Sequence, residues 1–218
     1  MKCKYCSSRC VRKGFQRNGT QKYQCKHCKK YQQRAYKYQA YHYQISQWIK
    51  ALLKEGNGIL SISRLLGISK CTVSKRILFL ATQIKRPAFI LMHKEYEMDE
   101  LRTYIGRKTR QYWIAYAIQK DTREVIDFKV GRRNKKTLGK VIDTLLLSQA
   151  KKIYTDKCPL YLNLIPKKLH VKQKHKINHI ERKNLNLRTH LRRLHRKTIC
   201  YSKSLLMLIA CLKIYFWG

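Results

Sequence analysis

The spacing of apolar residues changes along the chain, and each change predicts a different kind of element. Near the N-terminus residues alternate within VRKGFQRNGTQKYQC, which indicates a small β-ribbon. From Tyr43 apolar side chains recur every three or four positions, the spacing of amphipathic helices. After Phe89 alternation returns, and three strands followed by alternating helix and strand predict a mixed sheet with helices on its faces. The predicted elements are strands at 94–101, 111–119 and 124–131, a helix at 134–150, strands at 151–156 and 167–173, a helix carrying Ile180 to Leu194, and a helix at 204–218.

Two helices joined by a tight turn are predicted within ILSISRLLGISKCTVSKRILFL. Gly67 suits a left-handed helix end, Ile68 fills the turn, and Ser69 is expected to cap the second helix. Such helices also occur as plain packing units, but this pattern is typical of a DNA-binding helix-turn-helix. Its exposed polar positions would then face the major groove. They are Lys70, Thr72, Ser74, Lys75 and Arg76.

Two CxxC pairs near the N-terminus predict a structural zinc site, the alternative being unliganded thiols. Two such turns supply four thiolates for a tetrahedral Zn²⁺ ion, which would contribute the stability that so short a segment lacks. Cys10 and His27 are alternatives for a single ligand. The paired spacing favours Cys3, Cys6, Cys25 and Cys28.

The charge of the chain points to a polyanionic partner. There are 50 Lys and Arg residues against 11 Asp and Glu, giving a net charge of +39. Nucleic acid is the expected partner, because phosphate contacts would relieve the self-repulsion of so basic a protein. The apolar C-terminal stretch is too short to span a bilayer, and no signal peptide is visible. We therefore expect a cytoplasmic, nucleoid-associated protein with reduced cysteines and no membrane partner.

Acids are scarce enough for three of them to be conspicuous. After Thr144 only Asp156 and Glu181 occur, and Asp99 lies in a predicted strand. Carboxylates are the ligands that Mg²⁺ prefers, and two such ions form the clamp of phosphodiester chemistry. Glu100 competes with Asp99, but neighbours in a strand point to opposite faces, so we expect only one to face a metal. The alternatives are a turn cap for Asp156 and a helix ion pair for Glu181.

The three blocks that contain these acids are MDELRTYIGRKTRQYW, YTDKCPLY and HIERKNLNLRTHLRRLHRK. In this order, and with the short spacing between the last two acids, they resemble the catalytic blocks of the insertion sequence 1 family of DDE transposases. The resemblance implies a ribonuclease-H-like catalytic domain in which Asp99, Asp156 and Glu181 hold two Mg²⁺ ions, with Mn²⁺ as a substitute. It favours Asp99 over Glu100.

That family cuts DNA at the ends of its element and transfers the freed strand to a target. The resemblance therefore implies double-stranded DNA as partner, with the N-terminal half bound to the terminal inverted repeats. Because two ends must be paired, it also implies a homodimer or larger assembly. Arg188 and Arg192 would form a DNA-facing stripe on the helix of Glu181.

The chain is thus expected to be multidomain. Pro87 ends the preceding helix and marks a boundary. The expected domains are a zinc ribbon at 1–35, a helix-turn-helix region at 36–86 and an α/β catalytic domain at 87–218. Two alternatives stay open: a non-catalytic DNA-binding regulator, and a ribonuclease-H-like nuclease that acts on RNA–DNA hybrids.

Overall fold

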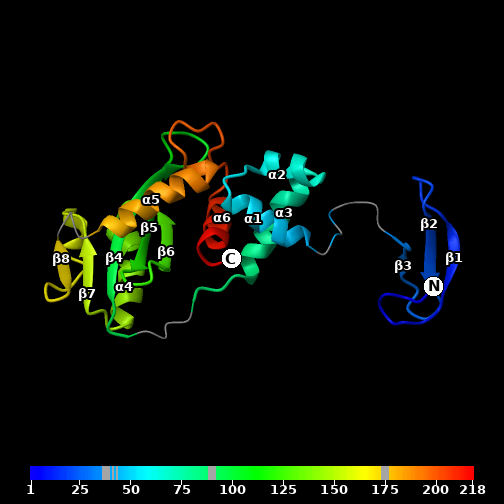
Figure 1. Ribbon diagram of the computed structural model, residues 1–218, viewed down its shortest axis with the longest axis horizontal. Helices are drawn as coiled ribbons and strands as arrows, with labels where there is room; N and C mark the ends of the chain where they lie inside the picture. The colour runs from blue at the N-terminus through cyan, green and yellow to red at the C-terminus, as the bar shows by residue number, and fades with distance from the viewer. Residues whose placement is uncertain (36–39, 41, 43, 88–91, 173–176) are drawn as a thin grey trace. The chain divides into compact units, whose positions relative to one another are not determined.

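A computed structural model describes residues 1–35, 40, 42, 44–87, 92–172 and 177–218 (Figure 1). The chain divides into two compact units, Met1–Ile45 and Ser46–Gly218. The start of the region expected at 36–86 lies largely outside the described residues, because residues 36–39, 41 and 43 are not described. Within the described part of the chain, no helix has both the length and the apolar character needed to cross a membrane.

The first unit is a three-stranded antiparallel sheet with its strands in sequence order. It comprises β1 (Cys10–Phe15), β2 (Gln21–Cys25) and β3 (Tyr31–Gln32). Gly19, at φ 75°, lies in the turn between the first two strands, a conformation that glycine adopts without steric cost. Cysteines form the small buried cluster of this unit: Cys3, Cys10 and Cys25 are buried, and Cys6, Tyr23 and Cys28 pack against them.

Three helices follow as predicted: α1 (Ile45–Lys54), α2 (Ile59–Leu66) and α3 (Lys70–Gln83). Gly67 ends α2 in the left-handed conformation with φ 60°. Ile68 is only 4% exposed, and the Ser69 hydroxyl accepts a hydrogen bond from the Thr72 amide at 3.0 Å. The predicted helix end, turn residue and cap are therefore confirmed.

The larger unit contains a five-stranded mixed sheet in the order β6-β5-β4-β7-β8. The predicted meander is antiparallel, and the two later strands run parallel to β4 on its other side. These strands are β4 (Glu95–Tyr104), β5 (Gln111–Gln119), β6 (Val125–Gly131), β7 (Lys152–Thr155) and β8 (His170–Lys172).

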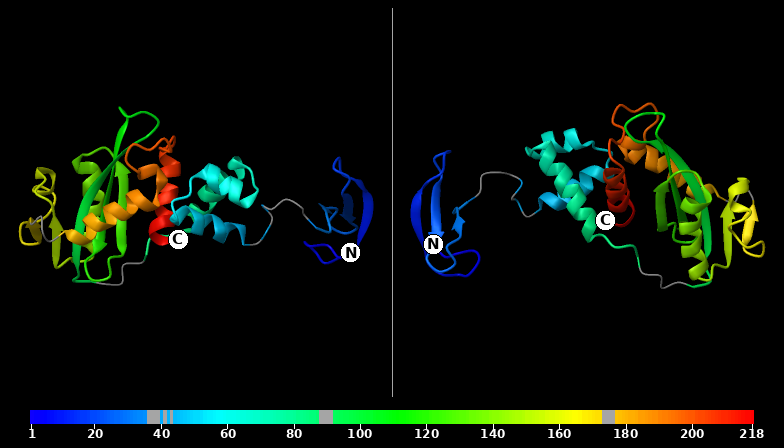
Figure 2. Two further views of the ribbon diagram at one scale, coloured as in Figure 1. Left: turned by 45° about the horizontal axis from the view of Figure 1, so that its top comes forward. Right: turned by 180° about the vertical axis from the view of Figure 1, so that it is seen from behind.

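Helices cover both faces of this sheet (Figure 2). The helix α4 (Lys135–Leu147) packs on the face that carries Met98 and Ala115. On the other face, α5 (Asn178–His190) crosses β4, and α6 (Leu205–Trp217) stacks its Phe216 ring on Tyr116. The helix α6 also packs against α3, so α1–α3 belong to the same compact unit as the sheet.

Candidate functional site

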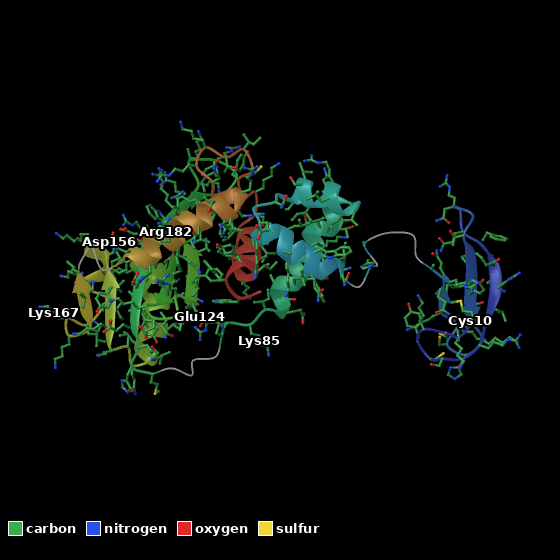
Figure 3. All side chains as sticks on the ribbon, viewed as in Figure 1. Cys10, Lys85, Glu124, Asp156, Lys167 and Arg182 are labelled. Atoms are coloured by element: carbon green, nitrogen blue, oxygen red, sulfur yellow. The ribbon has the colours of Figure 1, made fainter. Side chains whose placement is uncertain are left out.

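Three carboxylates converge where β7 ends beside β4. Asp99 and Glu100 lie on β4, and Asp156 follows the last residue of β7. One carboxylate oxygen from each lies within 4.8 Å of those of the other two. Figure 3 shows Asp156 at this end of β7. The structure thus brings together two of the three predicted acids and adds Glu100.

The parallel register of β4 and β7 explains why Asp99 meets Asp156. Glu97 is paired with Tyr154, so two residues further along each strand Asp99 comes level with Asp156. In a parallel pair, residues in register project from the same face. Asp99 and Asp156 therefore extend from the same side of the sheet, the side that α5 covers.

Asp99 is held by hydrogen bonds at both carboxylate oxygens. Oδ1 accepts from the Glu100 amide at 2.7 Å, and Oδ2 accepts from the Asn184 amide group on α5 at 2.6 Å. The Tyr116 hydroxyl in turn donates to Asn184 Oδ1 at 2.9 Å. Burial, together with the charges of Glu100 and Asp156, raises the pKa of Asp99 to about 7 despite these bonds. A divalent cation would relieve that repulsion.

Glu100 reaches the same cluster from the opposite face, contrary to the expectation that only one of the two neighbours could do so. Burial raises its pKa, while the Arg133 guanidinium and Tyr161 act against that rise. Arg133 Nε lies 3.4 Å from Glu100 Oε1, and its guanidinium stacks 4.7 Å from the Trp113 ring centroid.

Asp156 caps the turn that follows β7. Its Oδ1 accepts a hydrogen bond from the Cys158 amide at 3.0 Å, which fixes one oxygen and leaves the carboxylate in the cluster. Asp156 therefore caps the turn, as the alternative interpretation expected, and also lies beside Asp99 in the acid cluster. The two roles are compatible, because a carboxylate has two oxygens.

Glu181 lies in the first turn of α5, is exposed, and is not among the acids within 4.8 Å of one another. It precedes Asn184 by three positions, so both lie on the same side of the helix. Glu97, which is fully buried on β4, anchors this end of α5: it accepts hydrogen bonds from His179 Nδ1 at 2.7 Å and from the Ile180 amide at 2.9 Å. The start of α5 is thereby fixed to the strand of Asp99.

The residues predicted to face DNA differ in exposure. On α3, Lys70 and Lys75 are exposed, whereas Thr72, Ser74 and Arg76 are half-buried. Arg188 is half-buried on α5 and donates to the Leu194 carbonyl at 3.4 Å. The helix ends at His190, so Arg192 lies beyond it in a 3-10 turn, Arg192–Leu194, rather than on the helical stripe that we expected.

The four predicted cysteine ligands lie within 4.8 Å of one another in the first unit. The Sγ atoms of Cys3 and Cys28 are 3.6 Å apart, and those of Cys6 and Cys25 are 3.4 Å apart. Sulfurs at about 2.3 Å from a tetrahedral zinc ion would be ~3.8 Å apart, so the spacing suits that metal. Hydrogen bonds from the Ser8 amide and hydroxyl lower the pKa of Cys6 to about 5, which favours its thiolate.

Cys10 and His27 lie outside this group of four. The Cys10 sulfur accepts a hydrogen bond from the Gln32 amide group at 3.0 Å, and burial raises its pKa. Figure 3 labels Cys10 in this unit, where sulfur atoms are drawn in yellow. The donor sets of the two clusters therefore differ: four soft sulfurs suit zinc, and three hard oxygens suit magnesium or manganese.

Several residues around the acids were not singled out from the sequence. Tyr116 had a usable signal, because it pairs with Asp99 across the antiparallel strands. Arg133 and Tyr161 had none, since they come from a loop and a short turn whose positions depend on tertiary structure. Glu97 was recognisable only as an acid two residues before Asp99, on the same face of the strand.

A family model described as IS1 transposase matches residues 93–215. "Insertion element IS1 protein InsB" of Shigella flexneri is 43% identical over 108 residues, which are 50% of this chain and 82% of that protein. "Insertion element IS1 2 protein InsB" of Escherichia coli shows the same identity over the same length, and the match spans 65% of that relative.

A solved structure of a simian T-cell lymphotropic virus intasome, in complex with the PP2A regulatory subunit B56 gamma, is 16% identical with a TM-score of 0.33. It covers 65% of this chain and 59% of that chain. A likeness of that size bears on neither fold nor function.

Proposed function

The chain belongs to the IS1 transposase family, and we propose from this premise that it cuts DNA at the ends of an insertion element and transfers the freed strand to target DNA. The observation that carries the proposal is the meeting of Asp99 and Asp156 at adjacent strands of a mixed sheet. The strand order supports a ribonuclease-H-like fold for the region after Pro87. In such a sheet, distant residues are brought into one site by the ends of central strands.

Asp99, Asp156 and Glu181 are the proposed catalytic carboxylates and metal ligands. Two Mg²⁺ or Mn²⁺ ions held by these carboxylates would supply Lewis-acid activation of the attacking hydroxyl and charge stabilisation of the oxygens at phosphorus. Asn184 would orient Asp99, because the Asn184 amide group donates a hydrogen bond to Asp99 Oδ2. The Tyr116 hydroxyl donates to the Asn184 amide oxygen and so fixes the orientation of that amide. Glu181 would complete the ligand set from the first turn of α5, which Glu97 anchors.

The N-terminal half is proposed to hold the DNA. A zinc ribbon at 1–35, with Cys3, Cys6, Cys25 and Cys28 as ligands, would precede a helix-turn-helix in which α3 enters the major groove. Lys70 and Lys75 are the exposed cations of that helix among the predicted contacts. Pairing of the two element ends would require a homodimer or larger assembly on the DNA.

A cleavage and strand-transfer assay tests the proposal. Full-length protein is incubated with Mg²⁺ or Mn²⁺ and DNA that carries the repeats flanking its own gene. We expect Asp156→Asn to remove both products and to retain binding of the DNA ends. The matched control is Asp143→Asn, an exposed acid on α4 outside the cluster, which should leave the products unchanged.

Products formed at the wild-type rate by Asp156→Asn would refute the metal-ligand assignment. End binding without products in the wild type, with either metal, would instead support a DNA-binding regulator. Cutting of RNA–DNA hybrids without any requirement for end sequences would support the nuclease alternative.

A further inference from the structure

Glu100 belongs to the acid cluster although neighbouring residues of a strand project from opposite faces, so that Glu100 was expected to point away from Asp99. It shares the face of Met98, which packs against α4, whereas Asp99 points toward α5. The strand β7 ends at Thr155, while β4 continues to Tyr104. Among the described residues, no strand is paired with this edge of β4 after Glu97, so the longer Glu100 side chain can reach around the edge.

The counter-ion of Glu100 is placed at the rim of the site. The Glu100 side chain is 2% exposed, whereas that of Arg133 is 38% exposed. Arg133 also donates from Nη2 to the Cys158 sulfur at 3.3 Å and stacks on Trp113. A buried carboxylate requires a neutralising charge, and Arg133 supplies one from a position that water can reach.

A buried hydroxyl next to these acids lacks a well-formed hydrogen bond. Tyr161 is fully buried, and within the described part of the chain its hydroxyl has no partner at full hydrogen-bond distance and angle. Burial raises the pKa of Tyr161, and the charge of Glu100 and a weak side-chain interaction with that carboxylate add to the rise, so the phenol lies beside Glu100. A water molecule on a bound cation or a reoriented Glu100 carboxylate would complete the hydrogen bonding of this hydroxyl.

We propose that Glu100 is a fourth carboxylate of the metal centre, which binds a divalent cation together with Asp99 and Asp156, and that Arg133 neutralises Glu100 when no cation is bound. The proposal rests on the proposed function for the identity of the cation, Mg²⁺ or Mn²⁺. It adds to the three expected acids a ligand from the other face of the sheet. Arg133 and the cation then compete for the same carboxylate.

This competition gives two substitutions opposite effects. Glu100→Gln removes a ligand, and we expect Mn²⁺ affinity to fall by about tenfold or more. Losing a residue that only supports a metal ligand already costs that much affinity, so losing a ligand should cost at least as much. Arg133→Met keeps an apolar side chain over Trp113 and removes the competitor. An ion pair with one exposed partner is weak, so Arg133 competes only weakly with the cation for Glu100. We therefore expect its removal to raise Mn²⁺ affinity by only about threefold.

The experiment is a titration of zinc-loaded, full-length protein with Mn²⁺, in which electron paramagnetic resonance measures the free ion. Glu95→Gln is the matched control for Glu100→Gln, on the same strand outside the cluster, and Arg132→Met is the control for Arg133→Met. Both controls should titrate like the wild type. Unchanged Mn²⁺ affinity in folded Glu100→Gln, or lower affinity in Arg133→Met, would overturn the proposal.

Circular dichroism establishes that each variant is folded. If Glu100→Gln does not fold, the Arg133→Met result decides alone, and any result other than tighter binding overturns the proposal. Asp156→Asn separates this inference from the proposed function. Loss of Mn²⁺ binding in Asp156→Asn but not in Glu100→Gln refutes only the role of Glu100, whereas full binding in Asp156→Asn refutes the metal assignment on which both depend.

Discussion

Asp99 should make the metal-free protein less stable as the pH rises. Its pKa is raised from an ordinary 3.8 to about 7, chiefly by burial and further by the charges of Glu100 and Asp156. A group whose folded pKa lies above its unfolded value stabilises the fold at low pH, and this contribution is lost as the pH rises through the folded pKa. The window therefore extends from about pH 4 to about pH 8.

The size of the effect follows from the shift. One pKa unit corresponds to about 1.4 kcal/mol, so the full shift corresponds to about 4 kcal/mol. Because Asp99 would be nearly ionised in the unfolded chain and nearly protonated in the folded chain at pH 5, about 3 kcal/mol of this should disappear between pH 5 and pH 8. Saturating Mn²⁺ at pH 8 should restore stability, since it binds the ionised form in the folded state.

Asp99→Asn isolates this contribution, because asparagine does not titrate while the remaining groups titrate in both proteins. Urea unfolding followed by tryptophan fluorescence reports on the right unit, since Trp48, Trp113 and Trp217 all lie within Ser46–Gly218. From pH 5 to pH 8 without added divalent metal, the variant should gain about 3 kcal/mol relative to the wild type.

Added Mn²⁺ should stabilise the wild type far more than Asp99→Asn. The exposed-acid control Asp143→Asn should show no such pH-dependent difference. A wild-type and Asp99→Asn difference in unfolding free energy that is the same at both pH values would refute the claim that burial and the neighbouring charges raise the pKa of Asp99 in the folded protein.

Two other predictions follow from the contacts around the two clusters. Cys25→Ser, at a buried thiol, should unfold the three-stranded sheet within residues 1–35 and leave the tryptophan fluorescence of the larger unit unchanged; an intact set of amide resonances for this sheet would contradict a structural metal. Glu97→Gln should lower hydrogen-exchange protection at the start of α5 by about tenfold, because the residue loses a charge-assisted bond to His179 and weakens the one to Ile180. Glu95→Gln is its control, and equal protection in both would show that Glu97 does not anchor the helix.

Local signals explain what the sequence predicted well. Gly67, Ile68 and Ser69 each act through their own backbone or an adjacent turn, so the helix end, the turn and the cap were readable without tertiary structure. The same holds for the CxxC pairs, because their spacing alone brings two sulfurs together. The meeting of Asp99 and Asp156 was also predictable, since Asp99 lies on one strand and Asp156 directly follows another, and a mixed sheet places these two strands side by side.

What the sequence could not predict depends on where neighbouring elements end. The alternation of side chains along β4 predicted that Glu100 points away from the site. Glu100 can nevertheless reach the site, because β7 ends at Thr155 and leaves the edge of β4 open there. Helical periodicity placed Arg192 on the stripe of Arg188, but α5 ends at His190. No glycine or proline marks that end. Burial of Leu191 and Leu194 accompanies it, and their packing is a tertiary property.

The placement of Glu181 follows from how α5 is fastened to the sheet. Asn184 donates to Asp99 Oδ2, one of the oxygens available to a cation, while Glu97 holds the helix start independently of the acid cluster. A carboxylate oxygen has more than one lone pair, so a cation can bind Asp99 Oδ2 while the Asn184 hydrogen bond is kept. Glu181 lies one residue after Ile180 and one turn before Asn184, so the Glu97 anchor and the Asn184 bond hold α5 on both sides of the Glu181 carboxylate. Binding of a cation at Asp99 can thus leave the turn that carries Glu181 in place.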